Sequence, residues 1–209
     1  MAGEGGVTPT KYIGQTVPVH VELQMTEVVL AQPEMRAFLA AAKRIAVGEC
    51  MCRRDRGAEA CERPLEVCLA IDGEASRNLE TQGWRPISLE DALGVLEASH
   101  RAGLVHMAYR KPGLPPEIVC SCCACCCEPL RELRGRDYHD GYVESAYIAR
   151  FDPASCVGCG HCAERCVFGA FTLPAGTDRA TFDESKCFGC GLCASTCPSG
   201  AIDLIQRQV

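Results

Sequence analysis

The sequence has no excess of positive charge and no long apolar run. Its 209 residues include 21 Lys and Arg against 27 Asp and Glu, which gives a net charge of −6. Nucleic acids and anionic membranes bind basic surfaces, so neither is an expected partner. No run of roughly 18 apolar residues exists, and we expect no membrane span. Residues 1–10 contain neither a basic nor an apolar segment, so we see no secretory signal and expect a cytoplasmic protein.

Motifs for the common organic cofactors are also missing. No G-x-G-x-x-G follows a strand-like run and no P-loop occurs, so nicotinamide, flavin and ATP binding are not indicated. The absence of C-x-x-C-H excludes the covalent attachment of a c-type haem. What remains is a chain that is 47% hydrophobic and 23% charged, a composition typical of soluble globular proteins.

The abundant residue is cysteine, with 18 copies. A short secreted chain with so many cysteines would be held together by disulfides. Here the cysteines are concentrated at C-x-x-C spacing and no secretory signal is visible, which favours metal binding in a reducing compartment. The sequence therefore predicts metal centres rather than a disulfide framework.

Eight of these cysteines form an internal repeat. CVGCGHCAERCVFGAF at 156–171 aligns with CFGCGLCASTCPSGAI at 187–202, an offset of 31 residues. Each half reads C-x2-C-x2-C-x3-C, the ligand pattern of bacterial ferredoxins with two clusters. Zinc sites usually take two C-x-x-C pairs separated by a spacer, so zinc fits this pattern poorly. The predicted ligands are Cys156, Cys159, Cys162, Cys166, Cys187, Cys190, Cys193 and Cys197.

Residues 150–209 thus resemble the bacterial-type ferredoxins that carry two [4Fe–4S] clusters. The resemblance implies crossed ligation, in which the fourth cysteine of each half serves the other cluster. One cluster would take Cys156, Cys159, Cys162 and Cys197, and the other Cys187, Cys190, Cys193 and Cys166. Val167 replaces the proline that the family carries after the fourth cysteine, whereas Pro198 keeps it. We therefore expect the two clusters to differ in reduction potential.

Ten further cysteines lie in two N-terminal groups. The first group comprises Cys50, Cys52, Cys61 and Cys68, and the second comprises Cys120, Cys122, Cys123, Cys125, Cys126 and Cys127. The first group suits a tetrahedral zinc site, an iron–sulfur cluster or reactive thiols. Ten thiolates exceed the four of one cubane, so two clusters, or one cluster and reactive thiols, both fit.

Side chains alternate in direction along an extended chain. Within CSCCACCC, the thiols of Cys120, Cys122 and Cys126 therefore need not reach the same metal as those of Cys123, Cys125 and Cys127.

The N-terminal half carries a resemblance of its own. IAVGECMCRRD, CERPLEVCLAID, GLVH and VCSCCACCCEPLR, over roughly residues 30–134, are similar to iron–sulfur proteins of anaerobic bacteria and archaea that fuse this module to a dicluster ferredoxin. The resemblance implies how the domains are arranged along the chain more than what the protein does. We expect His106 in GLVH to be half-buried and hydrogen-bonded, with a role as ligand or proton relay as the alternative. Arg53 and Arg54 either lower thiolate pKa values or lie on the solvated surface.

The expected fold class is α+β, in four parts. They are an N-terminal segment at 1–30, a cysteine-rich α+β domain at 31–134, a connector at 135–149, and the dicluster ferredoxin unit, a pseudo-twofold ββ/αα repeat, at 150–209. Periodicity predicts a strand within 20–30, a helix from Met35 to near Gly48 and a strand over 104–109. A capping box at Ser88 and Asp91 begins a helix over 89–101. A short helix is expected after Pro64, and a hairpin from 171–173 and 181–182.

These features predict an electron carrier or electron-transfer subunit rather than a stand-alone enzyme. Two low-potential [4Fe–4S] clusters are the expected cofactors, with one or two further clusters or zinc in the N-terminal half. The partners would be redox proteins of a reductase or dehydrogenase system. One alternative is a reductase or redox sensor whose N-terminal module is the active site. Another is an interaction protein in which the clusters are structural or oxygen-sensing elements.

Overall fold

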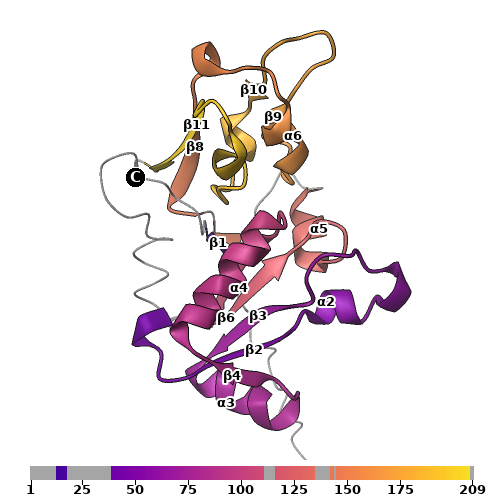
Figure 1. Cartoon of the computed structure of the whole chain (residues 1–209), viewed down its shortest axis with the longest axis vertical. Helices are drawn as coiled ribbons and strands as arrows, with labels where there is room; N and C mark the ends of the chain where they lie inside the picture. The colour runs from indigo at the N-terminus through magenta and orange to yellow at the C-terminus, as the bar shows by residue number, and fades with distance from the viewer. Residues whose placement is uncertain (1–12, 18–38, 111–115, 135–141, 144, 208–209) are drawn as a thin grey trace, which may run out of the picture.

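The computed structural model describes residues 13–17, 39–110, 116–134, 142–143 and 145–207 (Figure 1). Within these ranges, the N-terminal part is built on one seven-stranded sheet, and the C-terminal part contains two sheets of two strands each. Figure 1 shows the C-terminal part above one end of the larger sheet. This mixture of helices and small sheets agrees with the predicted α+β class. The predicted strand within 20–30 lies outside the described residues.

The large sheet has the strand order β4-β2-β3-β6-β5-β1-β7. Neighbouring strands are antiparallel, except that β1 and β7 are parallel. The strands are β1 (Ile13–Val17), β2 (Ile45–Glu49), β3 (Glu66–Ile71), β4 (Arg85–Ile87), β5 (Val105–Arg110), β6 (Pro116–Cys122) and β7 (Tyr142–Val143). The helices of this part are α2 (Met51–Arg54), α3 (Asp72–Thr81), α4 (Leu89–Arg101) and α5 (Glu128–Arg134).

Helix α4 lies on one face of the sheet, against the central strands. Its Ala92 and Leu96 are fully buried and pack against Val47, Leu69 and Val119. These are the residues of α4 that face the core, since they recur every four positions. The hydrophobic stripe of one helix thus covers strands β2, β3 and β6 together.

The start of α4 confirms the predicted capping box. The Ser88 hydroxyl accepts a hydrogen bond from the Asp91 N–H at 3.1 Å, and the Asp91 carboxylate accepts one from the Ser88 N–H at 3.3 Å. These bonds satisfy N–H groups that the first helical turn leaves without partners. The helix and the strand β5 that follows it both lie where the sequence predicts them.

The first predicted helix is too long and the second is wrong, because β2 and β3 occupy positions that the sequence assigned to helices. Residues 39–41 are helical, but the chain leaves that helix before Ile45 rather than near Gly48. The segment after Pro64 becomes β3. Ala46 and Ala70 pack against α3, whereas Val47 and Leu69 pack against α4. Strands covered on both faces consist of unbroken apolar runs, and periodicity alone does not distinguish such runs from buried helices.

The C-terminal part repeats its backbone structure at the same offset as its sequence. Strand β8 (Tyr147–Phe151) pairs with β11 (Ile202–Gln206), and β9 (Phe171–Thr172) pairs with β10 (Thr181–Phe182). The last pair confirms the predicted hairpin. Asp152 and Asp183, 31 residues apart, each cap a turn of 3-10 helix, at Pro153–Ser155 and Glu184–Lys186. The two halves are therefore built on one local plan.

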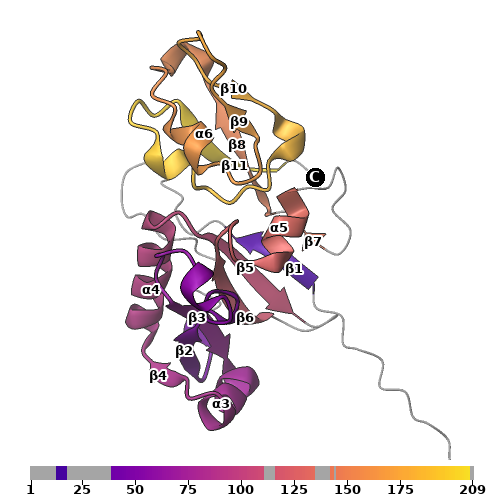
Figure 2. The same ribbon diagram turned by 90° about the vertical axis from the view of Figure 1, so that its right-hand side faces the viewer.

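The C-terminal part lies next to the end of α4 (Figure 2), and polar contacts join the two. Arg165, at the end of α6 (His161–Arg165), donates hydrogen bonds to the carbonyl oxygens of His100 and Arg101 at 2.6 and 3.3 Å. The Nε2 of His100 lies 2.8 Å from the Ser195 hydroxyl. A cation at the carboxyl end of a helix is favoured by the unpaired carbonyls there. The junction therefore fixes α4 against both halves of the repeat.

Replacement of the cap serine should weaken the N-terminal part. Ser88→Ala removes the acceptor of the Asp91 N–H, so the free energy of unfolding should fall by about 1 kcal/mol. Urea unfolding under anaerobic conditions, followed by circular dichroism, measures the change. Ser88→Thr keeps the hydroxyl and is the matched control. Equal losses in both variants would contradict the capping role.

Candidate metal centres

Two cavities in the C-terminal part are each lined by four cysteines. One is lined by Cys187, Cys190, Cys193 and Cys166. The other is lined by Cys156, Cys159, Cys162 and Cys197. Each cavity thus takes three cysteines from one half of the repeat and the fourth from the other half. These are the two sets of ligands that the ferredoxin resemblance implies.

The walls of the first of these cavities are apolar. Phe171, Phe188 and Leu192 line it together with the cysteines, and burial raises the pKa of the Cys190 thiol to about 12. Thiolates in such a place need a cationic partner, because a buried anion without one is costly. Four sulfur donors around an apolar cavity fit an iron–sulfur cluster, since soft thiolates are its usual ligands.

Residues 155–201 match the family model of the 4Fe-4S dicluster domain. The match supports the ferredoxin resemblance for this part of the chain and an iron–sulfur electron-transfer function. It does not extend to the N-terminal cysteines, and comparison with curated proteins gives no match for the chain. Across the described ranges, no helix combines the length and the apolarity that crossing a bilayer requires.

One glycine within residues 155–201 has no room for a side chain. Gly189, between Cys187 and Cys190, has φ of +72°, and an added Cβ would overlap the carbonyl of Tyr147. Left-handed backbone already disfavours other residues. The loop that carries three of the cysteines therefore packs directly on the backbone of strand β8.

The N-terminal cysteines converge from both groups because of the sheet register. In the β5–β6 pair, Cys122 is opposite Val105 and Cys120 is opposite Met107. The β3–β6 pair aligns Leu69 with Val119, so the next residue of each strand brings Cys68 beside Cys120. Residue Cys50 follows β2, and its N–H bonds to the Leu65 carbonyl at 2.8 Å. Three adjacent strands thus deliver thiols to one end of the sheet.

Six of these thiols form a closed circuit, which we call the thiol ring. Neighbouring thiols of this circuit interact electrostatically, and four of the six residues are buried. The order around the ring is Cys50, Cys68, Cys120, Cys122, Cys127, Cys52 and back to Cys50. The ring therefore combines both N-terminal cysteine groups, which the sequence keeps more than fifty residues apart.

Thiols of the ring share their protons unequally. Hydrogen bonds with Cys122 and Cys52 lower the pKa of Cys127 to about 4. Hydrogen bonds with Cys120 and Cys127, together with burial, raise the pKa of its ring neighbour Cys122 well above the usual value of a thiol. Thiolate and thiol thus lie next to each other in this dry site, as expected where several sulfur atoms share too few cations.

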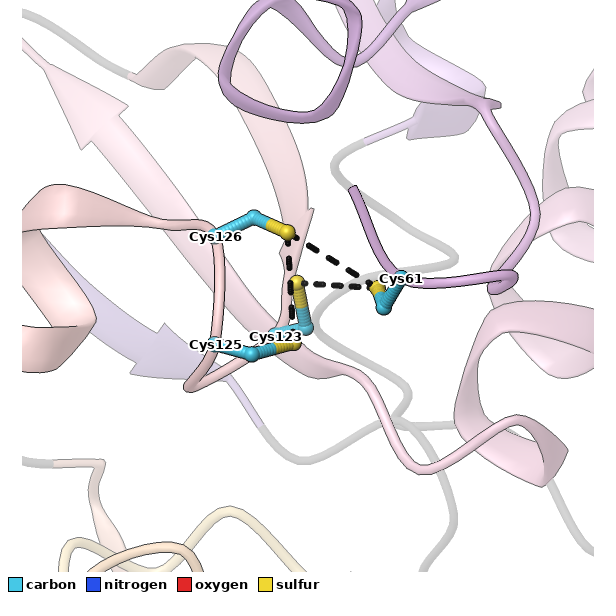
Figure 3. Close-up of side chains that lie close together, drawn as sticks. All are labelled: Cys61, Cys123, Cys125 and Cys126. Carbon is cyan, nitrogen blue, oxygen red and sulfur yellow. Dashed lines mark hydrogen bonds between the residues drawn. The ribbon is translucent and has the colours of Figure 1, made fainter. Parts of the chain in front are cut away.

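The other four N-terminal cysteines form a second, tighter assembly, which we call the four-thiol group. It comprises Cys61, Cys123, Cys125 and Cys126, whose Sγ atoms all lie within 4.8 Å of one another (Figure 3). The sequence-based division of 120–127 is therefore wrong in one respect: Cys126 joins Cys123 and Cys125, and Cys127 joins the ring. Strand β6 ends at Cys122 and a turn over 124–126 follows, so the alternation of an extended chain does not apply there.

The two arginines after Cys52 have different environments. Arg54 is exposed and pairs with Asp55 at 3.1 Å. Arg53 is buried, with 1% of its surface exposed. Its Nη1 lies 3.4 Å from the Cys123 sulfur, and its Nη2 donates to the Ser121 carbonyl at 3.2 Å. Of the two predicted roles, lowering the pKa of a nearby thiol therefore fits Arg53. Arg54 instead lies on the solvated surface.

His106 is fully buried rather than half-buried. Its Nδ1 lies 3.1 Å from the Ser121 hydroxyl, and its ring stacks on that of His100 with centroids 6.0 Å apart. Its Nε2 is buried without a hydrogen-bond partner among the described residues. Burial, with a smaller effect of His100, lowers the pKa of His106 to about 3, so the ring is neutral near pH 7.

Gly189→Ala should impair the cavity lined by Cys187, Cys190 and Cys193. The added methyl group displaces the loop from strand β8, and we expect a loss of up to about four irons per chain. Iron analysis after anaerobic purification measures it. Gly176→Ala is the control, because Gly176 also has positive φ but an added Cβ there meets no atom within 4 Å. Equal iron losses in both variants would show that the loss comes from backbone strain at positive φ and not from overlap with Tyr147.

Stability should fall in mild acid because His106 is buried in the neutral form. The unfolded chain takes up a proton below its ordinary pKa of about 6.5, whereas the folded chain does so only near 3. Stability present above pH 6.5 is therefore lost as the pH falls, by about 1.4 kcal/mol between pH 8 and 5.5. Urea unfolding at both pH values should show a smaller loss for His106→Gln. His161→Gln, at an exposed ring, should leave the wild-type loss in place.

Proposed function

We propose that this protein transfers single electrons through two [4Fe–4S] clusters in the dicluster domain and a third iron–sulfur centre in the thiol ring. The observation that carries the proposal is the pair of cavities, each lined by a crossed set of four cysteines. The match of residues 155–201 to the dicluster family supports it. The chain would serve as a carrier or subunit in a reductase or dehydrogenase system.

The clusters supply one-electron chemistry when bound, and the chain controls the conditions for it. Phe171 stacks on Phe182 with ring centroids 4.6 Å apart and meets the edge of Phe151 at 5.4 Å, which excludes water from the core of the domain. Hydrogen bonds to the ligands differ between the cavities. The Ala170 N–H donates to the Cys166 sulfur at 3.2 Å, whereas Cys197 lies 3.6 Å from the Ser199 hydroxyl. Such differences set unequal reduction potentials.

The cavities also differ in what surrounds them. Beside the cavity of Cys156, Val157 has 64% of its surface exposed, and Cys159 is exposed as well. Phe188 and Leu192, which line the cavity of Cys187, instead pack against buried residues of the N-terminal part. We call this cavity the inner cavity. This asymmetry supports entry of electrons from a partner at the exposed cavity and their transfer inward.

An apolar contact connects the inner cavity to the thiol ring. Phe188 and Leu192 line that cavity and pack in the same buried cluster as Cys122 and Cys127 of the ring. Cys190, a ligand candidate of the inner cavity, also packs there. Closely packed side chains without intervening polar layers keep neighbouring centres within a short, water-free distance. The ring is therefore the natural acceptor for the inner cluster.

A reductase activity at the thiol ring is the second candidate. Its support is that six thiols exceed the four ligands of a cubane, which leaves sulfur for chemistry. Electron paramagnetic resonance of the reduced protein separates the two. A spectrum that changes with a small-molecule substrate favours a reductase, and one that is insensitive to a broad panel favours a carrier.

Paired substitutions test the crossed ligand sets. Cys156→Ala with Cys197→Ala removes two ligands from one proposed cluster, so the chain should lose about four irons. Cys156→Ala with Cys166→Ala removes one ligand from each cluster, and the loss should approach eight irons. Iron and sulfide counts of both double variants give the answer. The opposite order of losses would exclude crossed ligation.

Iron in the thiol ring is tested by the metal content of the intact chain. We expect more than about eight irons and more than about eight acid-labile sulfides in the wild type, because two cubanes account for eight of each. Cys68→Ala, which removes a buried thiol of the ring, should lose the excess sulfide and keep the spectrum of the dicluster domain. A wild-type content of only eight sulfides would rule out the third centre and leave the dicluster proposal standing.

A further inference from the structure

The four-thiol group assembles at one point from two separate stretches of chain. Cys61 lies between α2 and β3, and the other three cysteines lie between β6 and α5. The Cys61 sulfur is 3.6 Å from that of Cys123 and 3.9 Å from that of Cys126. The sulfur atoms of Cys125 and Cys126 are 3.9 Å apart. Figure 3 shows the four side chains pointing toward a common centre.

These three distances are close to those around a single tetrahedral ion, and all four sulfur atoms lie within 4.8 Å of one another. Metal–sulfur bonds of about 2.3 Å at tetrahedral angles place the sulfur atoms about 3.8 Å apart. In a cubane each thiolate binds a different iron at a separate corner, so its four sulfurs stand farther apart. The cysteines of the dicluster domain form no group as tight as this one in the described part of the chain. The two kinds of site are thus distinguished by geometry.

Two arginines match the charge that such a site would carry. A divalent ion with four thiolates has an excess of two negative charges. Arg53 lies 3.4 Å from the Cys123 sulfur and Arg63 lies 3.6 Å from the Cys125 sulfur. The Nε of Arg53 is buried and has no hydrogen-bond partner among the described residues. A guanidinium buried in this way is costly unless an anion lies beside it.

We propose that Cys61, Cys123, Cys125 and Cys126 bind one mononuclear transition-metal ion, zinc or iron, and not a cluster. The ion ties the loop that carries Cys61 to the turn after β6. Because Cys122 and Cys127 flank that turn, the ion also fixes two members of the thiol ring. The site stands independently of the clusters proposed above, since its ligands belong to neither cavity nor ring.

Metal analysis of the full chain tests this site. The wild type and Cys125→Ser are purified anaerobically, and zinc, iron and acid-labile sulfide are counted. Cys125 is exposed, so its replacement should perturb folding little. We expect the variant to lose one zinc or one iron per chain, to keep its sulfide and to keep the cluster signals in electron paramagnetic resonance. For a zinc ion, X-ray absorption of the wild type at the zinc edge should show four sulfur ligands at about 2.3 Å and no neighbouring metal. For an iron ion, Mössbauer spectra of the wild type should contain one mononuclear iron besides the clusters, and Cys125→Ser should lack it.

Two further variants make the result specific. Cys61→Ser should lose the same ion, because it removes a ligand from the other stretch of chain. Cys52→Ser, in the thiol ring, should keep it. A loss of about four irons and four sulfides in Cys125→Ser would show a cubane at these residues and overturn the proposal. The proposal would also be overturned if the wild type contained no mononuclear ion. It would equally be overturned if neither Cys61→Ser nor Cys125→Ser changed the metal content. If Cys61→Ser fails to fold, Cys125→Ser and the wild-type absorption spectrum still decide.

Discussion

Buried sulfur is the constraint on which the rest of this structure depends. A neutral thiol packs as a small apolar group, but a thiolate inside a protein needs a cation beside it. Nine cysteines of the described chain are buried and several others are half-buried, so the fold brings them together instead of dispersing them through a core. They meet in two crossed cavities, one ring and one tight group. Each arrangement provides a place where positive charge can offset the thiolates.

The C-terminal cavities arise from local structure. Two loops of the same plan, capped by Asp152 and Asp183, each present three cysteines. The fourth cysteine of each half lies after a short helical turn and reaches the other cavity. Neither half has a complete cavity by itself. Because each cavity needs cysteines from both halves, the cavities themselves link the halves, and two short strand pairs suffice for the rest of the unit.

The two parts of the chain are joined by contacts of two kinds. Hydrogen bonds that Arg165 donates, and one between His100 and Ser195, fix the orientation of the end of α4. The apolar contacts of Phe188 and Leu192 exclude water between the inner cavity and the thiol ring. Polar contacts set the orientation, and apolar contacts bring the sulfur sites close. In the proposed function, this dry contact is what makes the ring an electron acceptor rather than a separate metal site.

Several elements could be predicted because their signals are local. The capping box at Ser88, the helix after it, the strand β5 and the hairpin of β9 and β10 follow from residues adjacent in sequence. Strands β2 and β3 could not be predicted in this way, because their apolar runs fit a buried helix equally well. What makes them strands is cover on both faces, by α3 and α4, and that cover comes from distant parts of the chain.

The sequence by itself predicted which eight cysteines of the C-terminal repeat act together as ligands, because C-x2-C-x2-C-x3-C spacing restricts where thiols in one loop can reach. Only the tertiary structure decided how the ten N-terminal cysteines divide. Strand register places Cys68 beside Cys120, and the end of β6 at Cys122 directs Cys123 and Cys126 toward Cys61. A residue's partners across a sheet or a turn depend on pairing between segments far apart in the chain, and spacing along the chain carries no information about that pairing.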